Sequence, residues 1–238
     1  MGSLRIYGFD FAFAPGESGR RLVARAASEP LSQKTSAARQ LSCCQPFSCG
    51  NRETKSEAVA AAARRYYRML ARFTTSPRLI ACQIDGRTQA GGLGLVAACD
   101  YAFCTPRSTF NLPEVLLGLV PAVVLPFLMR RIGWQRAYSL ALTARTVDAA
   151  QALTLGLVDE VNADGEEPLR RLLLSMNRTP AVSLQAAKRY GQELWPLTAA
   201  IEEQAVAQIS ELLADPAALD TIRALQEHGL WQSSMPSA

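Results

Sequence analysis

The chain has 238 residues and a formal net charge of +4 at pH 7, because 25 Lys and Arg stand against 21 Asp and Glu. Hydrophobic residues make up 49% of the chain, which is enough to fill the core of one large domain and excludes a globally disordered protein. A charge this small, scattered along the chain, gives no reason to expect a nucleic-acid partner.

Two residue types narrow the chemistry further. The only histidine is His228, which argues against a Ser-His-Asp hydrolase and against His-rich metal sites. None of the six cysteines forms a Cys-x-x-Cys pair, so zinc or thioredoxin chemistry has no support. Cys82, Cys99 and Cys104 stand in apolar runs, where a small buried thiol is typical, and we infer a reducing compartment.

Signals for export or membrane insertion are not evident in the sequence. No cationic segment followed by an apolar one opens the chain, and Ile6 breaks the myristoylation pattern. The longest apolar run, residues 115–129, is shorter than a membrane span and contains Pro121 and Pro126. We therefore expect a cytoplasmic protein with no membrane partner.

The first half of the chain predicts strands around one long helix. Alternation at residues 4–13 indicates a strand with a slip at Gly8, and residues 14–46 have little periodicity. Residues 54–73 have a helical pattern, and the apolar run 79–84 suits a buried parallel strand. A turn of small residues then leads into a short helix. Further short strands are expected at 101–104 and 109–111.

Beyond Gly118 the sequence predicts mostly helices. The expected helices are one capped by Thr146 and ending at Gly156, one from Pro180 to Leu194, one with the apolar face Ile201, Ala205, Ile209 and Leu212, and one from Asp215-Pro216 to Gly229 with His228 at its end. Early strands, a middle section in which strands and helices alternate, and late helices predict an α/β fold with a helical C-terminal module.

The turn of small residues before the short helix is a candidate site. The start of a helix exposes unpaired N–H groups and the positive end of the helix dipole, which suits a developing enolate or oxyanion in thioester chemistry. Residues 92–97 also match the dinucleotide pattern G-x-G-x-x-A, with Glu114 twenty residues beyond Gly94. Glu114, however, follows Pro113 and opens an apolar segment instead of ending a strand, so the motif is weak evidence for a nucleotide.

Several motifs in order resemble the crotonase (enoyl-CoA hydratase/isomerase) superfamily. They are Ile84-Asp85-Gly86, Ala90-Gly91-Gly92-Leu93-Gly94 and Ala98-Cys99-Asp100, then residues 110–121, then Gly156-Leu157-Val158-Asp159-Glu160-Val161. The resemblance runs from about Ala58 to the C-terminus. It implies an α/β fold, a crotonase-like ββα spiral with a C-terminal helical trimerisation module, acting on acyl thioesters of coenzyme A or of an acyl carrier protein.

The resemblance also implies a division of the chain. Residues 1–46 would form a divergent N-terminal segment of the spiral, residues 47–145 the core with the active site, and residues 146–238 the helical module. The opening strands of the family are not recognisable in residues 1–46. We expect a homotrimer or a hexamer, because the resemblance implies it and because the late helices carry more apolar surface than a small module buries alone.

The family's oxyanion hole uses two backbone N–H groups, and the resemblance assigns one of them to Gly91. The other has two candidates. Gly8-Phe9-Asp10-Phe11 matches the family motif by residue type and favours Phe9, whereas Phe47-Ser48-Cys49-Gly50 matches it by spacing and favours Asn51. Phe9 is the preferred candidate, and Asn51 is the alternative.

Glu114 matches the second of the two glutamates of typical hydratases, and Gly94 stands where the first would be. Water activation by two carboxylates is therefore not available, but Glu114 could remove the proton next to the thioester carbonyl. The acid for a leaving hydroxyl would be Glu114 itself or a residue that the sequence does not identify. Asp100 and Asp159 match family positions and are expected to cap or pair within the fold. Arg130, Arg131 and Arg136 would either meet phosphates or lie on a solvated face.

Within the superfamily, residues 90–100 and 117–133 resemble the dehydratases of polyketide β-branching cassettes. That resemblance implies a lyase that removes water from a 3-hydroxy-3-methylglutaryl group on an acyl carrier protein. The alternatives are an enoyl thioester double-bond isomerase and a catalytically weak homologue that serves as a binding subunit. We expect no metal and no nicotinamide, because the sequence lacks metal-ligand spacing and a complete βαβ fingerprint. The resemblance implies a substrate carried on coenzyme A or phosphopantetheine.

Overall fold

The computed structural model of the protein describes residues 3–12, 23–26, 52–164, 167–176, 179–215 and 220. Among the predictions from sequence, the oxyanion donor Asn51, the helix after Asp215 and His228 lie outside the described residues.

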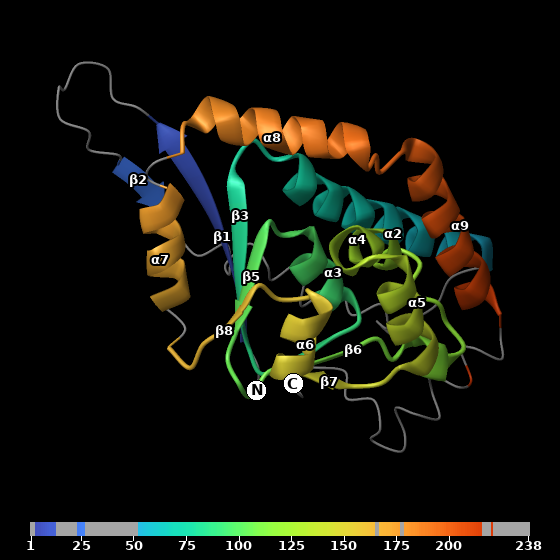
Figure 1. The fold of residues 1–238 in the computed structure, drawn as a ribbon. Helices are drawn as coiled ribbons and strands as arrows, with labels where there is room; N and C mark the ends of the chain where they lie inside the picture. The colour runs from blue at the N-terminus through green and yellow to red at the C-terminus, as the bar shows by residue number, and fades with distance from the viewer. Residues whose placement is uncertain are drawn as a thin grey trace, which may run out of the picture.

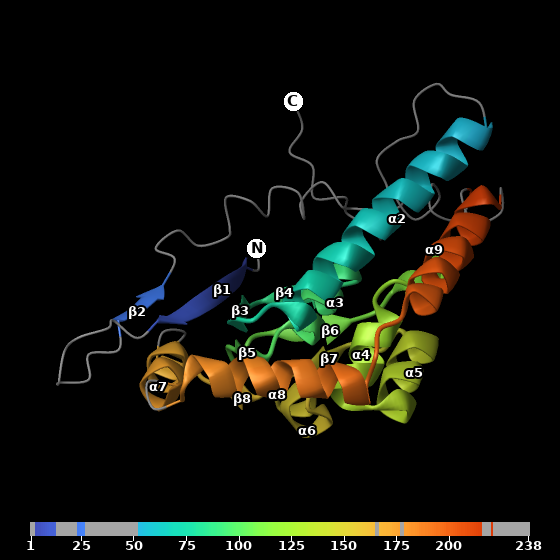
Figure 2. The same ribbon diagram turned by 90° about the horizontal axis from the view of Figure 1, so that it is seen from above.

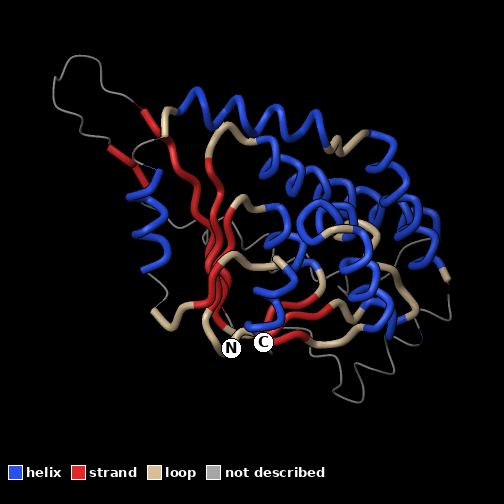
Figure 3. Tube along the Cα trace, viewed as in Figure 1, coloured by secondary structure: helices blue, strands red, loops and turns tan. Residues whose placement is uncertain are grey.

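A five-stranded sheet forms one layer of the molecule (Figure 1, Figure 3). Its strands, in spatial order, are β2 (Val23–Ala26), β1 (Ser3–Ala12), β3 (Leu79–Asp85), β5 (Tyr101–Cys104) and β8 (Glu160–Val161). The last three run parallel, and β1 runs antiparallel to both of its neighbours. The predicted parallel strand at 79–84 is thereby confirmed.

The two faces of β3 pack against different layers of the molecule. Ile80, Cys82 and Ile84 belong to the main core, whereas Leu79 and Ala81 on the other face pack with residues of α7 (Glu167–Met176). Successive strand residues point to opposite faces, so a strand covered on both sides is apolar throughout. This is why residues 79–84 show no polar alternation.

A smaller sheet lies beside the first and leads to the candidate site. It has the order β4 (Arg87–Gln89), β6 (Thr109–Asn111) and β7 (Val147–Asp148), with β4 and β6 parallel. Strand β7 belongs to the small sheet and β8 to the large one. Both sheets therefore include residues beyond 145, in the segment expected to be a helical module.

The described helices gather mainly on the face of the large sheet that carries the main core (Figure 1). Those between the strands are α3 (Gly91–Ala98), the short 3₁₀ helix η2 (Glu114–Leu117), α4 (Leu125–Ile132), α5 (Trp134–Thr143) and α6 (Ala149–Leu155). The longer ones are α2 (Arg52–Thr75), α8 (Ala181–Leu194) and α9 (Ala199–Ala214). None of the helices in the described part of the chain is long and apolar enough to cross a membrane.

The cap of α6 differs from the prediction. Asp148, not Thr146, caps this helix: its side chain accepts a hydrogen bond from the Gln151 N–H at 2.8 Å, and the Gln151 side chain accepts one from the Asp148 N–H at 3.1 Å. This is a capping box, and it uses the Asp-x-x-Gln spacing that the sequence already displays. The predicted end at Gly156 is confirmed, with φ 78°.

Helices α2 and α9 lie side by side (Figure 2). Arg68 of α2 pairs with Glu202 at 2.7 Å, and Arg64 pairs with Glu203 at 2.6 Å. Ala205 and Ile209 of α9 are buried in the main core. The apolar face expected to need a partner subunit is therefore covered within the chain, and it does not itself support a trimer.

Candidate active site

The turn before α3 has a strained backbone. Ala90 adopts φ 49° and ψ −124°, a region that residues with a side chain rarely occupy, and such residues cost about 1–3 kcal/mol each. Two hydrogen bonds hold it there: the Ala90 N–H donates to the Asn111 carbonyl at 3.2 Å, and the Leu93 N–H donates to the Ala90 carbonyl at 2.9 Å. Gly91 follows as the first residue of α3, so its N–H has no acceptor within the helix.

The small sheet brings Glu114 to the same edge as Gly91. Gln89 ends β4 and pairs with Asn111, the end of the parallel strand β6, and the Gln89 Nε2 donates to the Asn111 Oδ1 at 2.8 Å. Since parallel strands finish at one edge, the residues that follow them lie near one another. Glu114 is three residues beyond Asn111, a span of about 10 Å at most.

The carboxyl group of Glu114 lies in an environment that favours its neutral form. Burial raises its pKa from 4.5 to about 7. Its Oε2 atom is buried and has no hydrogen-bond partner among the described residues. Glu114 opens η2 and does not end a strand, as the sequence predicted. A carboxyl group with a pKa near neutrality can both accept and return a proton.

Tyr66 is a residue of this site that sequence reasoning missed. From α2, its hydroxyl donates a hydrogen bond to the carbonyl oxygen of Gly91. A Cβ added at Gly94, one turn into α3, would lie 2.7 Å from the same hydroxyl oxygen and 3.0 Å from the Leu70 Cδ1. The place beside Gly94 is therefore filled by the phenol, and a glutamate there would have to displace it. The glycine at position 94 was the only sign of this contact in the sequence.

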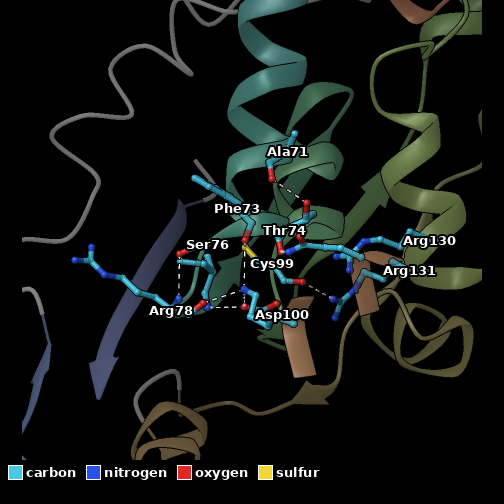
Figure 4. A network of polar contacts seen from close by, with 12 residues as sticks. Ala71, Phe73, Thr74, Ser76, Arg78, Cys99, Asp100, Arg130 and Arg131 are labelled. Carbon is cyan, nitrogen blue, oxygen red and sulfur yellow. Dashed lines mark hydrogen bonds and ion pairs between the residues drawn. The ribbon is translucent and has the colours of Figure 1, made fainter. Parts of the chain in front are cut away.

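The other end of α3 is held by a network of paired charges (Figure 4). The Asp100 Oδ2 accepts hydrogen bonds from the Ile80 N–H at 2.8 Å and from the Lys188 Nζ at 2.5 Å. The same Lys188 ammonium donates to the Arg78 carbonyl at 2.9 Å, which attaches α8 to the start of β3. The structural role expected for Asp100 is thereby confirmed.

Arg130 and Arg131 complete this network and do not form a solvated face. Arg131 donates to the carbonyls of Leu157 at 2.7 Å and Cys99 at 3.0 Å, and to the Asp159 Oδ2 at 2.5 Å. Arg130 reaches the Ala97 carbonyl at 3.3 Å. Asp159 also accepts from the Ala102 N–H at 2.7 Å, so its expected pairing role is confirmed. Cations at these carbonyls match the negative end of the α3 dipole.

The structure does not bring Phe9 and Gly91 together. Phe9 lies inside β1, opposite Leu79 on one side and Ala26 on the other. Leu79 begins β3, and the next residue, Ile80, bonds to Asp100 just beyond the last residue of α3. Gly91 is at the opposite end of that helix. Phe9 matches the family motif by residue type, but the pairing of β1 with β3 puts it near the end of α3 that is opposite Gly91.

Comparison with known proteins assigns the family. The model of the enoyl-CoA hydratase/isomerase family matches residues 47–225, most of the chain. The chain belongs to this family, and its fold is that of the crotonases. The bacillaene synthase dehydratase PksH of Bacillus subtilis is 32% identical over 150 residues, which are 63% of this chain and 58% of PksH. The match thus covers less than two thirds of that relative.

Solved structures agree with this assignment. The crystal structure of PksH from Bacillus subtilis superposes with a TM-score of 0.64 and 27% identity, over 76% of this chain and 74% of PksH. An enoyl-CoA hydratase from Mycobacterium avium superposes with a TM-score of 0.67 and 26% identity, over 74% of this chain and 70% of that protein. The fold class expected from the sequence is confirmed.

Proposed function

We propose that this protein is a lyase that dehydrates a β-hydroxy acyl thioester, with Glu114 as its proton-transfer group and the Gly91 N–H as an oxyanion donor. The observation that carries the proposal is the buried carboxyl group of Glu114 at the edge of the small sheet where α3 begins, where burial raises its pKa to about 7. A base with this pKa is close to optimal at neutral pH, because it is largely available and still holds a proton well once it takes one.

The reaction needs one proton taken and one given. The Glu114 carboxylate removes the proton from the carbon next to the thioester carbonyl, and negative charge develops on the carbonyl oxygen. The Gly91 N–H, at the positive end of α3, stabilises that charge. The electron pair then forms the carbon–carbon double bond as the C–O bond to the β-hydroxyl breaks. The hydroxyl is protonated and leaves as water. Protonated Glu114 is the candidate proton donor, and giving up this proton returns Glu114 to its carboxylate form.

The second oxyanion donor has two candidates, and the position of Phe9 bears on the choice between them. Because Phe9 lies in β1 at the far end of α3, we favour the N–H of Asn51. In the sequence this residue directly precedes α2, the helix that carries Tyr66 to the site. An Asn51→Pro variant removes this N–H, and it should lower turnover without changing the fold if the assignment holds.

The similarity to PksH, a bacillaene synthase dehydratase, supports a dehydration in polyketide synthesis. The sequence resemblance to β-branching dehydratases implies 3-hydroxy-3-methylglutaryl on an acyl carrier protein as the substrate. The test is mass spectrometry of an acyl carrier protein loaded with this group and incubated with the protein. A loss of the mass of one water is expected, and the coenzyme A thioester of the same acid serves as the comparison. No loss of water from either thioester would contradict the proposed function.

An isomerase is the second candidate, because a single carboxyl group such as Glu114 can move a proton between two carbons of an enoyl thioester. A 3-enoyl thioester converted to its 2-isomer faster than water is lost from the hydroxy acid would favour it. A protein that binds the loaded carrier but changes neither substrate would be the binding subunit that is the third alternative.

We also propose a homotrimer or a hexamer, with the outer face of α8 in the subunit contact. Val182, Tyr190 and Leu194 are 72%, 61% and 65% exposed and recur at spacings of eight and four residues, so they lie on one face of this helix. Large apolar side chains that line one exposed face are typical of a surface covered by another subunit. Sedimentation at micromolar concentration tests this, and a monomer would contradict it.

A further inference from the structure

We propose that Tyr66 is a positioning residue, which holds Gly91 through its carbonyl so that the N–H of the same residue points at the thioester oxygen. This inference rests on the proposed function. Tyr66 would be needed for the dehydration although it does not touch the reacting atoms. The geometry of three neighbouring groups supports it: the Tyr66 hydroxyl, the Gly91 carbonyl and the side-chain-free position at Gly94.

The first support is the hydrogen bond itself. The Tyr66 hydroxyl donates to the carbonyl of Gly91, the residue whose own N–H is the proposed donor. In the first turn of a helix, the N–H direction depends on the backbone angles of the residue before it. Here that residue is Ala90, with φ 49°. A backbone this strained persists only when its surroundings fix it. Tyr66 supplies one such constraint on the residue that immediately follows.

The second support is the space left for the phenol. A Cβ at Gly91 would lie 3.3 Å from the Tyr66 hydroxyl oxygen, and one at Gly94 would lie 2.7 Å from it. At Gly94 the Leu70 Cδ1 and the Val124 Cγ2 are also close, at 3.0 and 3.1 Å. Neither glycine needs a positive φ, so their missing side chains serve packing rather than backbone freedom. The hydroxyl is thus seated against α3 by its neighbours.

The reaction step that depends on this arrangement is formation of the enolate. A hydrogen bond to the carbonyl oxygen strengthens as negative charge develops there, so a misdirected N–H lowers kcat more than it raises KM. Removing an oxyanion donor outright costs roughly 10²–10³-fold in kcat, and loosening one should cost less. We expect Tyr66→Phe to lower kcat by about ten- to a hundred-fold, with a change in KM of less than about three-fold.

The chain offers a matched control in the adjacent residue. Tyr67 is 1% exposed, and its hydroxyl has no hydrogen-bond partner among the described residues. Its ring packs against Phe127 at a centroid distance of 5.1 Å. Tyr67→Phe removes the same atom from the same helix but leaves Gly91 untouched. We expect this variant to keep the kcat of the wild type.

The decisive measurement uses the product of the proposed dehydration, the 3-methylglutaconyl thioester, labelled with ¹³C at the carbonyl carbon. The quantity measured is the infrared C=O stretching frequency of this thioester when it is bound. Oxyanion hydrogen bonds polarise this carbonyl and lower its frequency relative to solution. In Tyr66→Phe the frequency should move back toward the solution value, whereas Tyr67→Phe should keep the wild-type frequency. Glu114→Gln should keep the frequency and lose turnover, which separates positioning from proton transfer.

A second variant covers the case in which Tyr66→Phe does not fold. Gly94→Ala pushes the phenol away from α3. It should raise the C=O frequency and lower kcat, as Tyr66→Phe is expected to do.

A Tyr66→Phe protein with wild-type frequency and kcat would overturn the inference, and so would a loss of kcat at unchanged frequency. A wild-type protein that neither dehydrates the substrate nor shifts the carbonyl frequency would instead overturn the proposed function, and this inference with it.

Discussion

The two ends of α3 are built in opposite ways. At its N-terminal end, Ala90 has a strained backbone, no side chain caps the helix, and a buried oxygen of Glu114 lacks a partner within the described structure. At its C-terminal end, Asp100, Arg131 and Asp159 each make two or more hydrogen bonds. The polar groups of Asp100, Arg131 and Asp159 at one end of this eight-residue helix are therefore bonded within the protein, whereas the Glu114 oxygen at the other end is not.

This difference follows from the helix dipole. The carbonyls at the C-terminal end carry partial negative charge, and Arg130 and Arg131 meet them. The N–H groups at the other end carry partial positive charge, which a substrate oxygen can meet. A short helix that is fixed at one end can present its other end to a ligand without moving. The fixed C-terminal end of α3 thus allows polar groups at the N-terminal end to remain without hydrogen-bond partners in the described structure.

The largest effect is expected when the open end loses its proton-transfer group. Glu114→Gln keeps the shape of the side chain but removes the carboxyl group that transfers the proton. The kcat for water loss should therefore fall by roughly 10²–10⁴-fold. Binding of the carrier-bound substrate should persist. Glu203→Gln, the same change at an exposed site on α9, is the control and should leave kcat unchanged. Wild-type turnover in Glu114→Gln would make Glu114 a structural residue.

Breaking the firmly held end should affect stability instead of chemistry. Lys188→Met leaves Asp100 without its cation, and the Lys188 and Asp100 side chains are only 10% and 18% exposed. Loss of one partner from a buried pair is strongly destabilising, and we expect the free energy of unfolding to fall by about 2–4 kcal/mol in urea titrations.

The matched control for that change is Arg170→Met, which breaks the exposed pair with Glu167 and should leave the free energy of unfolding nearly unchanged. The kcat of folded Lys188→Met should match the wild type. A change in kcat as large as that of Glu114→Gln would show that the two ends of α3 are not separate in function.

The pH dependence should move activity and stability in opposite directions. The raised pKa of Glu114 means that the folded protein holds a proton between about pH 4.5 and 7 that the unfolded chain has released. The contribution of this group to stability is therefore fully present below pH 4.5 and is lost as the pH rises to about 7, by up to about 3 kcal/mol. Over the same interval kcat/KM should rise, because the base form increases.

Urea titrations of the wild type and Glu114→Gln at several pH values test the sign, since other titrating groups cancel in the difference between the two proteins. A difference that stays constant from pH 5 to pH 8 would contradict the assigned pKa.

The smallest effect is expected from Tyr67→Phe. Burial raises the pKa of Tyr67 to about 12, and its hydroxyl is unsatisfied in the described part of the chain. Removing an unsatisfied buried group is close to neutral or slightly stabilising, by no more than about 1 kcal/mol. Thermal unfolding of this variant should show an equal or higher midpoint. A clear loss of stability would indicate a partner for this hydroxyl.

Local sequence predicted the elements that depend on nearby residues. The strands at 101–104 and 109–111 have the predicted bounds, and the helices expected at 54–73 and 180–194 differ by one or two residues at their ends. These segments have a clear period and clear stop signals. The cap of α6 was misassigned because Thr146 and Asp148 are both good capping residues, and only the reciprocal bond with Gln151 separates them.

The site was predictable only where it follows the chain. Gly91 and Glu114 follow the paired strand ends Gln89 and Asn111, so motifs along the chain were enough to single them out. Tyr66 was not predictable, because helical periodicity tells which face of α2 is apolar but not which residue of α3 it meets. The position of Phe9 was not predictable for a related reason: a motif gives the residue type, whereas the position of that residue relative to Gly91 depends on the register of β1 against β3.

The pairing of β1 with β3 sets a constraint on how the chain can be synthesised. Phe9 pairs with Leu79, so the first strand is made some 70 residues before its partner. At about 5–20 residues per second, the edge of β1 that pairs with β3 must wait roughly 4–14 s on the ribosome with its backbone groups unpaired. An unpaired strand is a template for association with other chains. Slowed translation between residues 26 and 79 should therefore reduce the yield of folded protein more than an equal delay after residue 104, when β3 and β5 are already in place.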